Sequence, residues 1–147
     1  MSAPATFKSI LLPVDLWESP ASLKHLATAA AMARSNACPV HALTVLPDMV
    51  AIEHYRFAAA TFDEVVVKAE GELRALLERT MPAEVTWTSG VARGDIYKEI
   101  LHTAAERGAD LIVMAAHRPR MTDFLIGSNA EKVVRHAKCS VLIVRGT

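Results

Sequence analysis

A short stretch near the carboxyl end of the chain has the residue types that bind anions. It contains three basic side chains, His117, Arg118 and Arg120, followed by Gly127-Ser128-Asn129. A helix that begins at Gly127-Ser128 would present free backbone N–H groups and the positive end of its dipole. The guanidinium groups would add forked donors that suit phosphate oxygens. We therefore expect an anion-binding helix start here.

The same residues can be explained without a ligand. Ser128 and Glu131 have the spacing of a capping box, in which the two side chains satisfy the first backbone N–H groups of a helix. The basic cluster could likewise be a solvated loop. Because a capping box and a phosphate can share one helix start, the sequence leaves both interpretations open.

A carboxylate follows the first apolar segment of the chain. Asp15 comes directly after Ile10-Leu11-Leu12-Pro13-Val14, where it could accept hydrogen bonds from a ribose hydroxyl or a base amino group. The alternative is a loop residue that caps the next turn.

Other chemistry finds little support in the pattern. There is no Gly-x4-Gly-Lys-Ser/Thr loop and no Gly-x-Ser-x-Gly elbow. We expect no catalytic set and no metal site, because a lone Asp123 is weak evidence for magnesium. The remaining histidines lack the spacing of a metal or catalytic pair and are expected to be structural or surface groups: His25, His41, His54, His102 and His136.

Hydrophobic periodicity predicts five strands that alternate with four helices. The strands are expected over residues 7–14, 39–45, 84–91, 111–114 and 141–144. The helices are expected over 20–36, from the capping box at 61–64 to Pro82, over 96–107, and from 128 onward. Alternation of this kind implies a parallel sheet with helices on both faces, and its ligands bind beyond the carboxyl ends of the strands. The strand at 84–91 alternates apolar and polar residues, so we place it at a sheet edge.

Composition limits the class of protein. The 147 residues predict one domain, 1–147, and 52% hydrophobic residues exclude a disordered chain. Sixteen Lys+Arg balance sixteen Asp+Glu, so we expect no nucleic-acid partner. No apolar run is long enough to span a membrane and the first residues lack signal-peptide features, which predicts a soluble cytoplasmic protein. If two other strands separate those that Cys38 and Cys139 precede, the two thiols lie roughly 14 Å apart and are expected to be reduced.

With these residues placed, the chain resembles the universal stress protein family, in its small adenine-nucleotide-binding form. The resemblance covers nearly the whole chain and depends on the order of several segments: 10–15, 43–45, 91–95, 109–114, 127–137 and 139–145. It implies a three-layer, doubly wound α/β fold of the Rossmann-like kind, with five parallel strands in the order 3-2-1-4-5. It also implies a homodimer and, in one branch of the family, a bound ATP.

The loop after the fourth strand departs from the pattern of that branch, which is Gly, two residues, Gly, nine residues, then Gly-Ser or Gly-Thr. Ala115 and Arg118 stand where the two glycines would be, and eight residues separate Arg118 from Gly127. The chain instead resembles a subgroup whose loop is Ala-x-His-Arg-Pro, which is also associated with nucleotide. Arg118 could supply a cationic donor in place of the lost backbone approach.

The resemblance implies a non-enzymatic, ATP-binding protein of the stress response, with ADP or AMP as other candidate ligands and magnesium left open. The residues implied to bind the nucleotide are Pro13, Val14, Asp15, Val45, Met114, Ala115, His117, Arg118, Arg120, Gly127, Ser128 and Asn129. Dimerisation is expected through antiparallel pairing of Val141, Leu142, Ile143 and Val144. One rival hypothesis is a nucleotide-free dimeric adaptor, and a second is slow phosphate transfer to Ser128 or Thr122.

Overall fold

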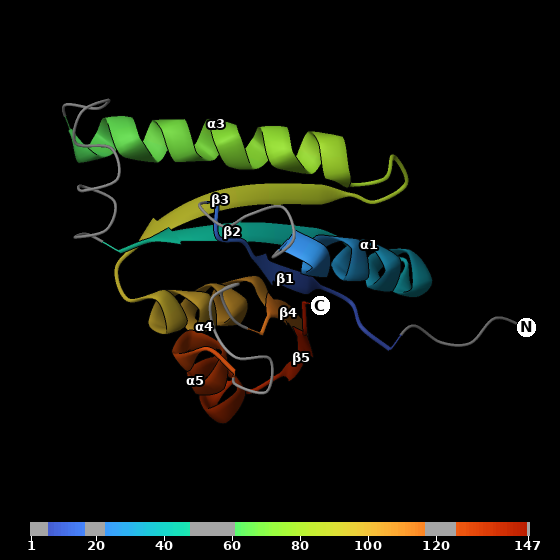
Figure 1. Ribbon diagram of the computed structural model, residues 1–147. Helices are drawn as coiled ribbons and strands as arrows, with labels where there is room; N and C mark the ends of the chain where they lie inside the picture. The colour runs from blue at the N-terminus through green and yellow to red at the C-terminus, as the bar shows by residue number, and fades with distance from the viewer. Residues whose placement is uncertain (1–5, 17–22, 48–60, 117–125, 147) are drawn as a thin grey trace, which may run out of the picture.

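The computed structural model describes residues 6–16, 23–47, 61–116 and 126–146, in which strands and helices alternate (Figure 1). In chain order these elements are β1 (Ile10–Pro13), α1 (Lys24–Asn36), β2 (Val40–Leu46), α3 (Phe62–Thr80), β3 (Trp87–Arg93), α4 (Ile96–Arg107), β4 (Leu111–Ala115), α5 (Ser128–His136) and β5 (Ser140–Val144). The predicted alternation is therefore confirmed.

The strands form one parallel sheet in the order β3-β2-β1-β4-β5. Helices α1 and α3 cover one face of this sheet, and α4 and α5 cover the other (Figure 1). The chain reverses direction across the sheet between β3 and β4, which is why the two helix pairs lie on opposite faces. The predicted three-layer fold and strand order are confirmed.

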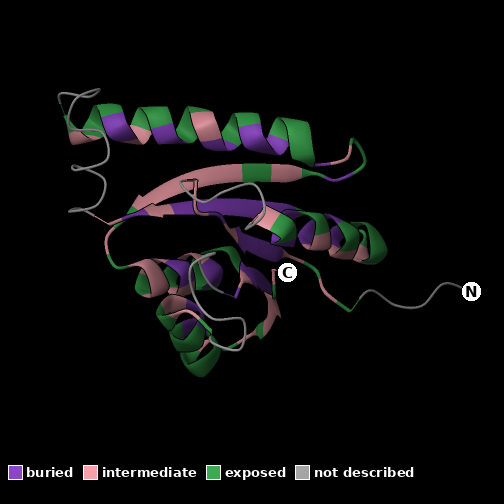
Figure 2. Cartoon of the chain, in the orientation of Figure 1, coloured by how far each residue is buried: buried purple, intermediate pink, exposed green. Residues whose placement is uncertain are grey.

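The core lies along the central strands, which are buried on both faces (Figure 2). Ile10 and Leu12 face the α1 side, whereas Leu11 and Ile112 face the α4 side. Helix α1 packs closely on its face through Ala29, Ala30 and Ala33. Continuous apolar runs thus mark the buried strands, as expected for a parallel sheet.

Both ends of β3 differ from the prediction for local reasons. Strand β3 begins at Trp87 rather than at 84, because the Val85 N–H bonds to the Pro82 carbonyl in a turn. It continues to Arg93 because β2 extends to Leu46 and pairs with it. The predicted helix start at 20 lies outside the described residues, and the described helix α1 begins at Lys24.

Two side chains accept hydrogen bonds from the backbone of the residues that precede β1. The Asn36 side-chain oxygen accepts the N–H groups of Thr6 and Phe7, both at 3.0 Å. The Asp110 carboxylate accepts the next two, from Lys8 and Ser9, at 2.9–3.1 Å. Four successive backbone donors are satisfied before the sheet begins, which fixes the position of β1 in the sheet.

His41 on β2 is buried at the edge of the region covered by α4. Its side chain is 8% exposed, and Nδ1 lies 2.7 Å from the Thr88 hydroxyl oxygen on β3. Gly90 leaves room for the ring, since a Cβ there would be 3.3 Å from Nε2. Burial lowers the His41 pKa to about 4, with a smaller contribution from the positive charge of Arg107.

We expect His41 to make folding pH-dependent. Its pKa of about 4 in the fold lies below the ordinary 6.5, so the unfolded chain binds the proton more tightly. The free energy of unfolding should therefore fall as pH drops below 6.5, by at most about 1.4 kcal/mol per pH unit from this group. Urea denaturation at several pH values between 7 and 5 measures this effect. For His41→Asn, whose amide can still reach Thr88, the free energy of unfolding should change less steeply with pH. The exposed His102→Asn serves as control, and an unchanged slope in His41→Asn would contradict the assignment.

A second prediction concerns Gly71, in the middle of α3. The residue is exposed, and a Cβ built there meets no atom within 4 Å. Gly71→Ala should raise the free energy of unfolding by about 0.5–1 kcal/mol, because glycine loses more conformational freedom in a helix. Gly90→Ala is the matched control and should give no gain, because its methyl group would crowd His41. Equal gains at both positions would contradict this explanation.

Candidate functional site

The candidate site lies at the carboxyl end of the sheet, between β1 and β4. These strands are neighbours, but β1 leads to α1 on one face and β4 leads toward α5 on the other. A crevice is expected at such a switch point, where the chain departs in opposite directions. The predicted location is thus consistent with the observed topology.

Pro13 separates β1 from β4 at this end. The bonds from Ile10 N to Pro39 O and from Val14 N to Leu43 O show that even-numbered residues of β1 direct their backbone groups toward β2. Pro13 therefore faces β4, but it has no N–H to donate. Pairing with β4 accordingly stops at Leu11, whereas pairing with β2 continues to Pro13. The sequence predicted a strand over 7–14, with Pro13 either as its last residue or in a bulge; the described strand ends at Pro13.

Two polar side chains donate hydrogen bonds to carbonyls at the end of β1. Neither was predicted to belong to the site. His25 of α1 is 3% exposed, and its Nε2 donates to the Pro13 carbonyl at 2.7 Å. Thr44 is also 3% exposed, and its hydroxyl donates to the Val14 carbonyl at 3.0 Å. Both carbonyls thus accept a hydrogen bond from a side chain rather than from a neighbouring strand. Asp15, the next residue, is partly exposed.

Val45 directs its backbone groups toward the crevice. The bonds from Val40 N to Thr86 O and from Gly94 N to Leu46 O show that even-numbered residues of β2 face β3. Val45 therefore faces the β1 side, past the last β1–β2 pair at Leu43. In a continued ladder the Val45 N–H would donate to the Val14 carbonyl, but that carbonyl accepts the Thr44 hydroxyl. No described backbone group pairs with the Val45 N–H and C=O, so one residue offers a donor beside an acceptor.

Helix α5 begins directly beside the end of β4. The Gly127 N–H donates to the Ala116 carbonyl at 2.6 Å, and the Gly127 carbonyl accepts the Glu131 N–H at 2.9 Å. The helix starts at Ser128, so the N–H groups of Ser128, Asn129 and Ala130 have no partner within the helix. Three adjacent donors and the positive helix end point away from α5 at the carboxyl edge of the sheet.

The predicted capping box at Ser128 and Glu131 is wrong. Gly127 is the N-cap residue, Ser128 is the first residue within the helix, and no side chain caps this end. Glu131 pairs instead with Arg135, with a separation of 2.9 Å between Oε1 and Nη2. The bond between Gly127 and Ala116 fixes the start of the helix one residue earlier than the Ser-x-x-Glu pattern suggests. By contrast, the capping box at Thr61 is confirmed in part, since the Glu64 N–H donates to its hydroxyl at 3.2 Å.

The structure brings most of the predicted site residues to one edge. Pro13 ends β1 and is followed by Val14 and Asp15, and Val45 lies near the end of β2. Met114 and Ala115 end β4, and Gly127 caps the start of α5, which begins with Ser128 and Asn129. Met114 is buried in the core on the α4 side, so its side chain packs rather than facing the crevice. His117, Arg118 and Arg120 lie outside the described residues.

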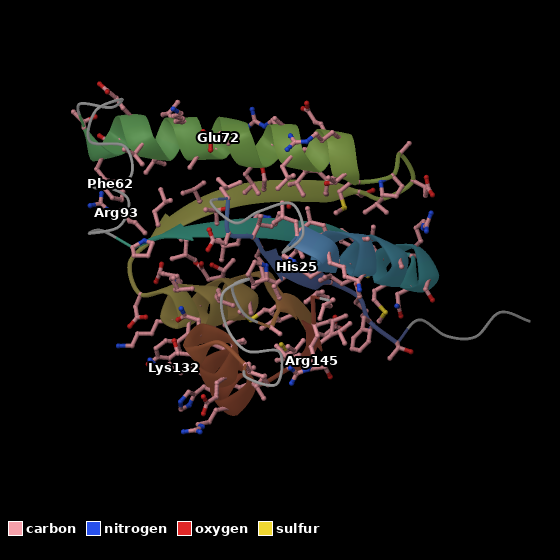
Figure 3. All side chains as sticks on the ribbon, in the orientation of Figure 1. His25, Phe62, Glu72, Arg93, Lys132 and Arg145 are labelled. Atoms are coloured by element: carbon pink, nitrogen blue, oxygen red, sulfur yellow. The ribbon has the colours of Figure 1, made fainter. Side chains whose placement is uncertain are left out.

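One contact at this edge was not anticipated. The Arg93 guanidinium carbon lies 3.7 Å from the centre of the Phe62 ring, a cation–π contact between the end of β3 and the start of α3 (Figure 3). Arg93 is also the register partner of Leu46 at the end of β2. The ends of β2 and β3 and the start of α3 are therefore held together.

Metal and thiol chemistry gain no support from the described ranges. Within them no group of three or more His, Cys, Asp or Glu side chains is arranged to hold a metal ion. Cys38 and Cys139 are free thiols, and burial raises the pKa of each, with Asp110 adding to the effect. No helix in the described part of the chain is long and apolar enough to cross a membrane.

Comparison with known sequences points to one family. Residues 6–145 match the family model described as the universal stress protein family. Universal stress protein G of Shigella flexneri is 33% identical over 142 residues, which cover 95% of this chain and 99% of that relative. Both matches span nearly the full length of this chain.

Solved structures share the fold. Universal stress protein UspA from Lactobacillus plantarum aligns with a TM-score of 0.71 and 24% identity, over 98% of this chain and 100% of that one. A universal stress protein in complex with cAMP aligns with a TM-score of 0.63 and 19% identity, over 96% and 98%. One from Archaeoglobus fulgidus in complex with dAMP aligns with a TM-score of 0.58 and 23% identity, over 92% and 96%.

Proposed function

Because the chain belongs to the universal stress protein family, we propose that it is a non-catalytic regulatory protein of the stress response whose ligand is ATP. One observation carries the proposal: at the same edge of the sheet lie the Val45 backbone groups and the first N–H groups of α5, for which the described residues supply no backbone partner. This arrangement offers separate contacts for a base and for a phosphate.

The base contact uses the backbone of Val45. Adenine presents an amino donor beside a ring-nitrogen acceptor, which is complementary to the C=O and N–H of one extended residue. Pro13, Val14, Met114 and Ala115 would line the pocket through their main chains. The structural relatives in complex with cAMP and dAMP support this ligand class, since both ligands carry adenine.

The sugar and phosphate contacts use Asp15 and α5. The Asp15 carboxylate would accept the ribose hydroxyls, and the N–H groups of Ser128, Asn129 and Ala130 would donate to phosphate oxygens. Gly127 precedes these donors without a side chain, which lets a phosphate approach closely. His117, Arg118 and Arg120 would add positive charge, and their part in the site remains a proposal.

No chemical step is proposed. Transfer of phosphate to Ser128 or Thr122 would require a general base and metal ions placed around the phosphates. The proposed contacts bind the base, the sugar and the charge of the ligand, which suits a protein that responds to nucleotide rather than one that consumes it. Intact-mass spectrometry after incubation with ATP and magnesium separates the two, because self-phosphorylation would add one phosphate.

We further propose that the protein is a homodimer joined through β5. The bond from Ala116 N to Val144 O shows that Val144 faces β4, so the backbone groups of Val141 and Ile143 point away from the sheet. No described strand pairs with this edge, and Val141, Leu142, Ile143 and Val144 are all half-buried. Antiparallel pairing with a second copy across a two-fold axis would satisfy these groups.

ATP, ADP and AMP should each raise the melting temperature of the protein. A ligand that binds only the folded state stabilises it by about 2.7 kcal/mol at a hundredfold excess over Kd. For a chain of this size that corresponds to roughly 5 to 10 °C in a thermal-shift measurement. GTP should give a smaller shift, because guanine presents its donor and acceptor in the reverse order. No shift at millimolar adenine nucleotide would favour the nucleotide-free adaptor instead.

The phosphate contact can be tested by replacing Ser128 with proline. Proline is favoured at the first position of a helix, and Gly127 has φ −60° and ψ 153°, which a following proline tolerates. Ser128→Pro should therefore keep α5 but remove one of its three free donors. Calorimetry should show ATP binding weakened by about tenfold, the value expected for one hydrogen bond to a charged group.

Ser128→Ala is the matched control, because it removes only the hydroxyl and keeps the N–H. It should bind ATP nearly as tightly as the parent protein. Equal affinity in the proline and alanine variants, with both folded by circular dichroism, would show that phosphate does not bind at this helix start.

A further inference from the structure

One face of β2 is apolar except at Thr44. On the side covered by α1 and α3 the strand buries Val40, Ala42 and Leu46, each at most 1% exposed. Thr44 continues this alternation and is 3% exposed. A valine would fill nearly the same volume without the cost of burying a hydroxyl. The hydroxyl is therefore explained by the hydrogen bond that it makes rather than by packing.

The ladder between β1 and β2 stops within one residue. The Val14 N–H donates to the Leu43 carbonyl at 2.8 Å, whereas the Val14 carbonyl accepts the Thr44 hydroxyl at 3.0 Å. The next two bonds of the ladder, from Val45 N to Val14 O and from Leu16 N to Val45 O, are absent among the described backbone pairs. Because the Val14 N–H still reaches Leu43, the strands are at pairing distance where the ladder stops. The next bond is thus lost at one carbonyl, not through a gradual separation of the strands.

The direction of the Val14 carbonyl explains the lost bond. The Thr44 hydroxyl lies on the α1 side of the sheet, whereas the Val45 N–H lies in the plane of the ladder. A carbonyl oxygen has two lone pairs, but a strongly bent hydrogen bond is weak. One residue earlier, the Pro13 carbonyl also accepts a donor from this side, the His25 imidazole of α1, at 2.7 Å (Figure 3). Two successive carbonyls, which point to opposite neighbours in a regular strand, are thus both directed toward donors on the α1 side.

We propose that Thr44 is a positioning residue for the base contact: its hydroxyl holds the Val14 carbonyl away from the Val45 N–H, which keeps the backbone of Val45 open for adenine. This inference rests on the proposed function for the identity of the ligand. Without the hydroxyl, the Val14 carbonyl would accept the Val45 N–H, and β1 and β2 would pair one step further. The ladder and the base would then compete for the same N–H. Thr44 therefore prepares the site before the ligand arrives, which lowers the cost of binding.

Thr44→Val tests this role, and Thr44→Ser is the matched control. Valine keeps the volume and the branched shape but cannot donate, whereas serine keeps the hydroxyl and loses only the methyl group. NMR of the ligand-free protein detects a backbone hydrogen bond through the scalar coupling between the amide nitrogen and the acceptor carbonyl carbon. A coupling from Val45 to Val14 should appear in Thr44→Val and be absent from the parent protein and Thr44→Ser. Exchange of the Val45 amide should slow by about tenfold in Thr44→Val alone, the value expected for one added backbone hydrogen bond.

Calorimetry with ATP and GTP measures the consequence for ligand binding. Thr44→Val should bind ATP about tenfold more weakly, because the base must displace one backbone hydrogen bond, and Thr44→Ser should bind it as the parent protein does. The ratio of ATP to GTP affinity should also fall in Thr44→Val, because the contact that is lost is the one that distinguishes the bases. A variant that was only less well folded would lose affinity for both nucleotides equally.

The outcomes separate this inference from the proposed function. A coupling from Val45 to Val14 in the ligand-free parent protein, or none in a folded Thr44→Val, overturns the positioning role and leaves nucleotide binding intact. A new coupling with unchanged ATP affinity also overturns it, because the base would then not use Val45. A parent protein that binds no adenine nucleotide overturns the proposed function and, with it, the role of Thr44 in binding. If Thr44→Val does not fold, Thr44→Ala, which also lacks the hydroxyl, provides the same comparison.

Discussion

The candidate site depends on the backbone of Pro13. In a regular parallel sheet β1 would pair with both neighbours along its whole length. Pro13 faces β4 without an N–H, so that pairing ends at Leu11 while pairing with β2 continues. The Pro13 carbonyl, which would otherwise be left unsatisfied, accepts the buried His25 imidazole. One missing donor thus accounts for the early end of β1–β4 pairing at the point where the helices change faces.

The contacts available in this opening are mostly backbone groups, which helps to explain how the family pattern can vary here. Val45 offers its N–H and C=O because the Thr44 hydroxyl takes the Val14 carbonyl out of the ladder. The first N–H groups of α5 have no partner within the helix, since Gly127 bonds back to Ala116 and no described side chain caps this end. None of these groups depends on a glycine at 115 or 118. The described positions of these backbone groups are therefore compatible with Ala115 and Arg118 where the family pattern has glycine.

Much of the fold could be predicted from the sequence, because buried parallel strands and amphipathic helices have strong patterns. The strand order followed from the family resemblance, and the sheet confirms it. The errors arose where tertiary bonds override local patterns. Ser128-x-x-Glu131 has the form of a capping box, but the bond between Gly127 and Ala116, eleven positions apart, sets the helix start. His25 was missed because a buried histidine does not fit an apolar pattern, and the direction of Val45 appears only once the ladder is known.

The two open edges of the sheet differ in a way that favours β5 as the surface for a second copy. Edge strand β3 carries the polar residues Thr88, Ser89 and Arg93, which tolerate water, and Gly90, which disfavours strand pairing. Strand β5 carries four consecutive apolar residues after Ser140, with Leu142 and Val144 packed on the α1 side and Val141 and Ile143 on the α5 side. An apolar edge of this kind is costly to leave in water. Because β5 also borders β4, whose end leads to the crevice, the edge that most needs a partner is the one nearest the site.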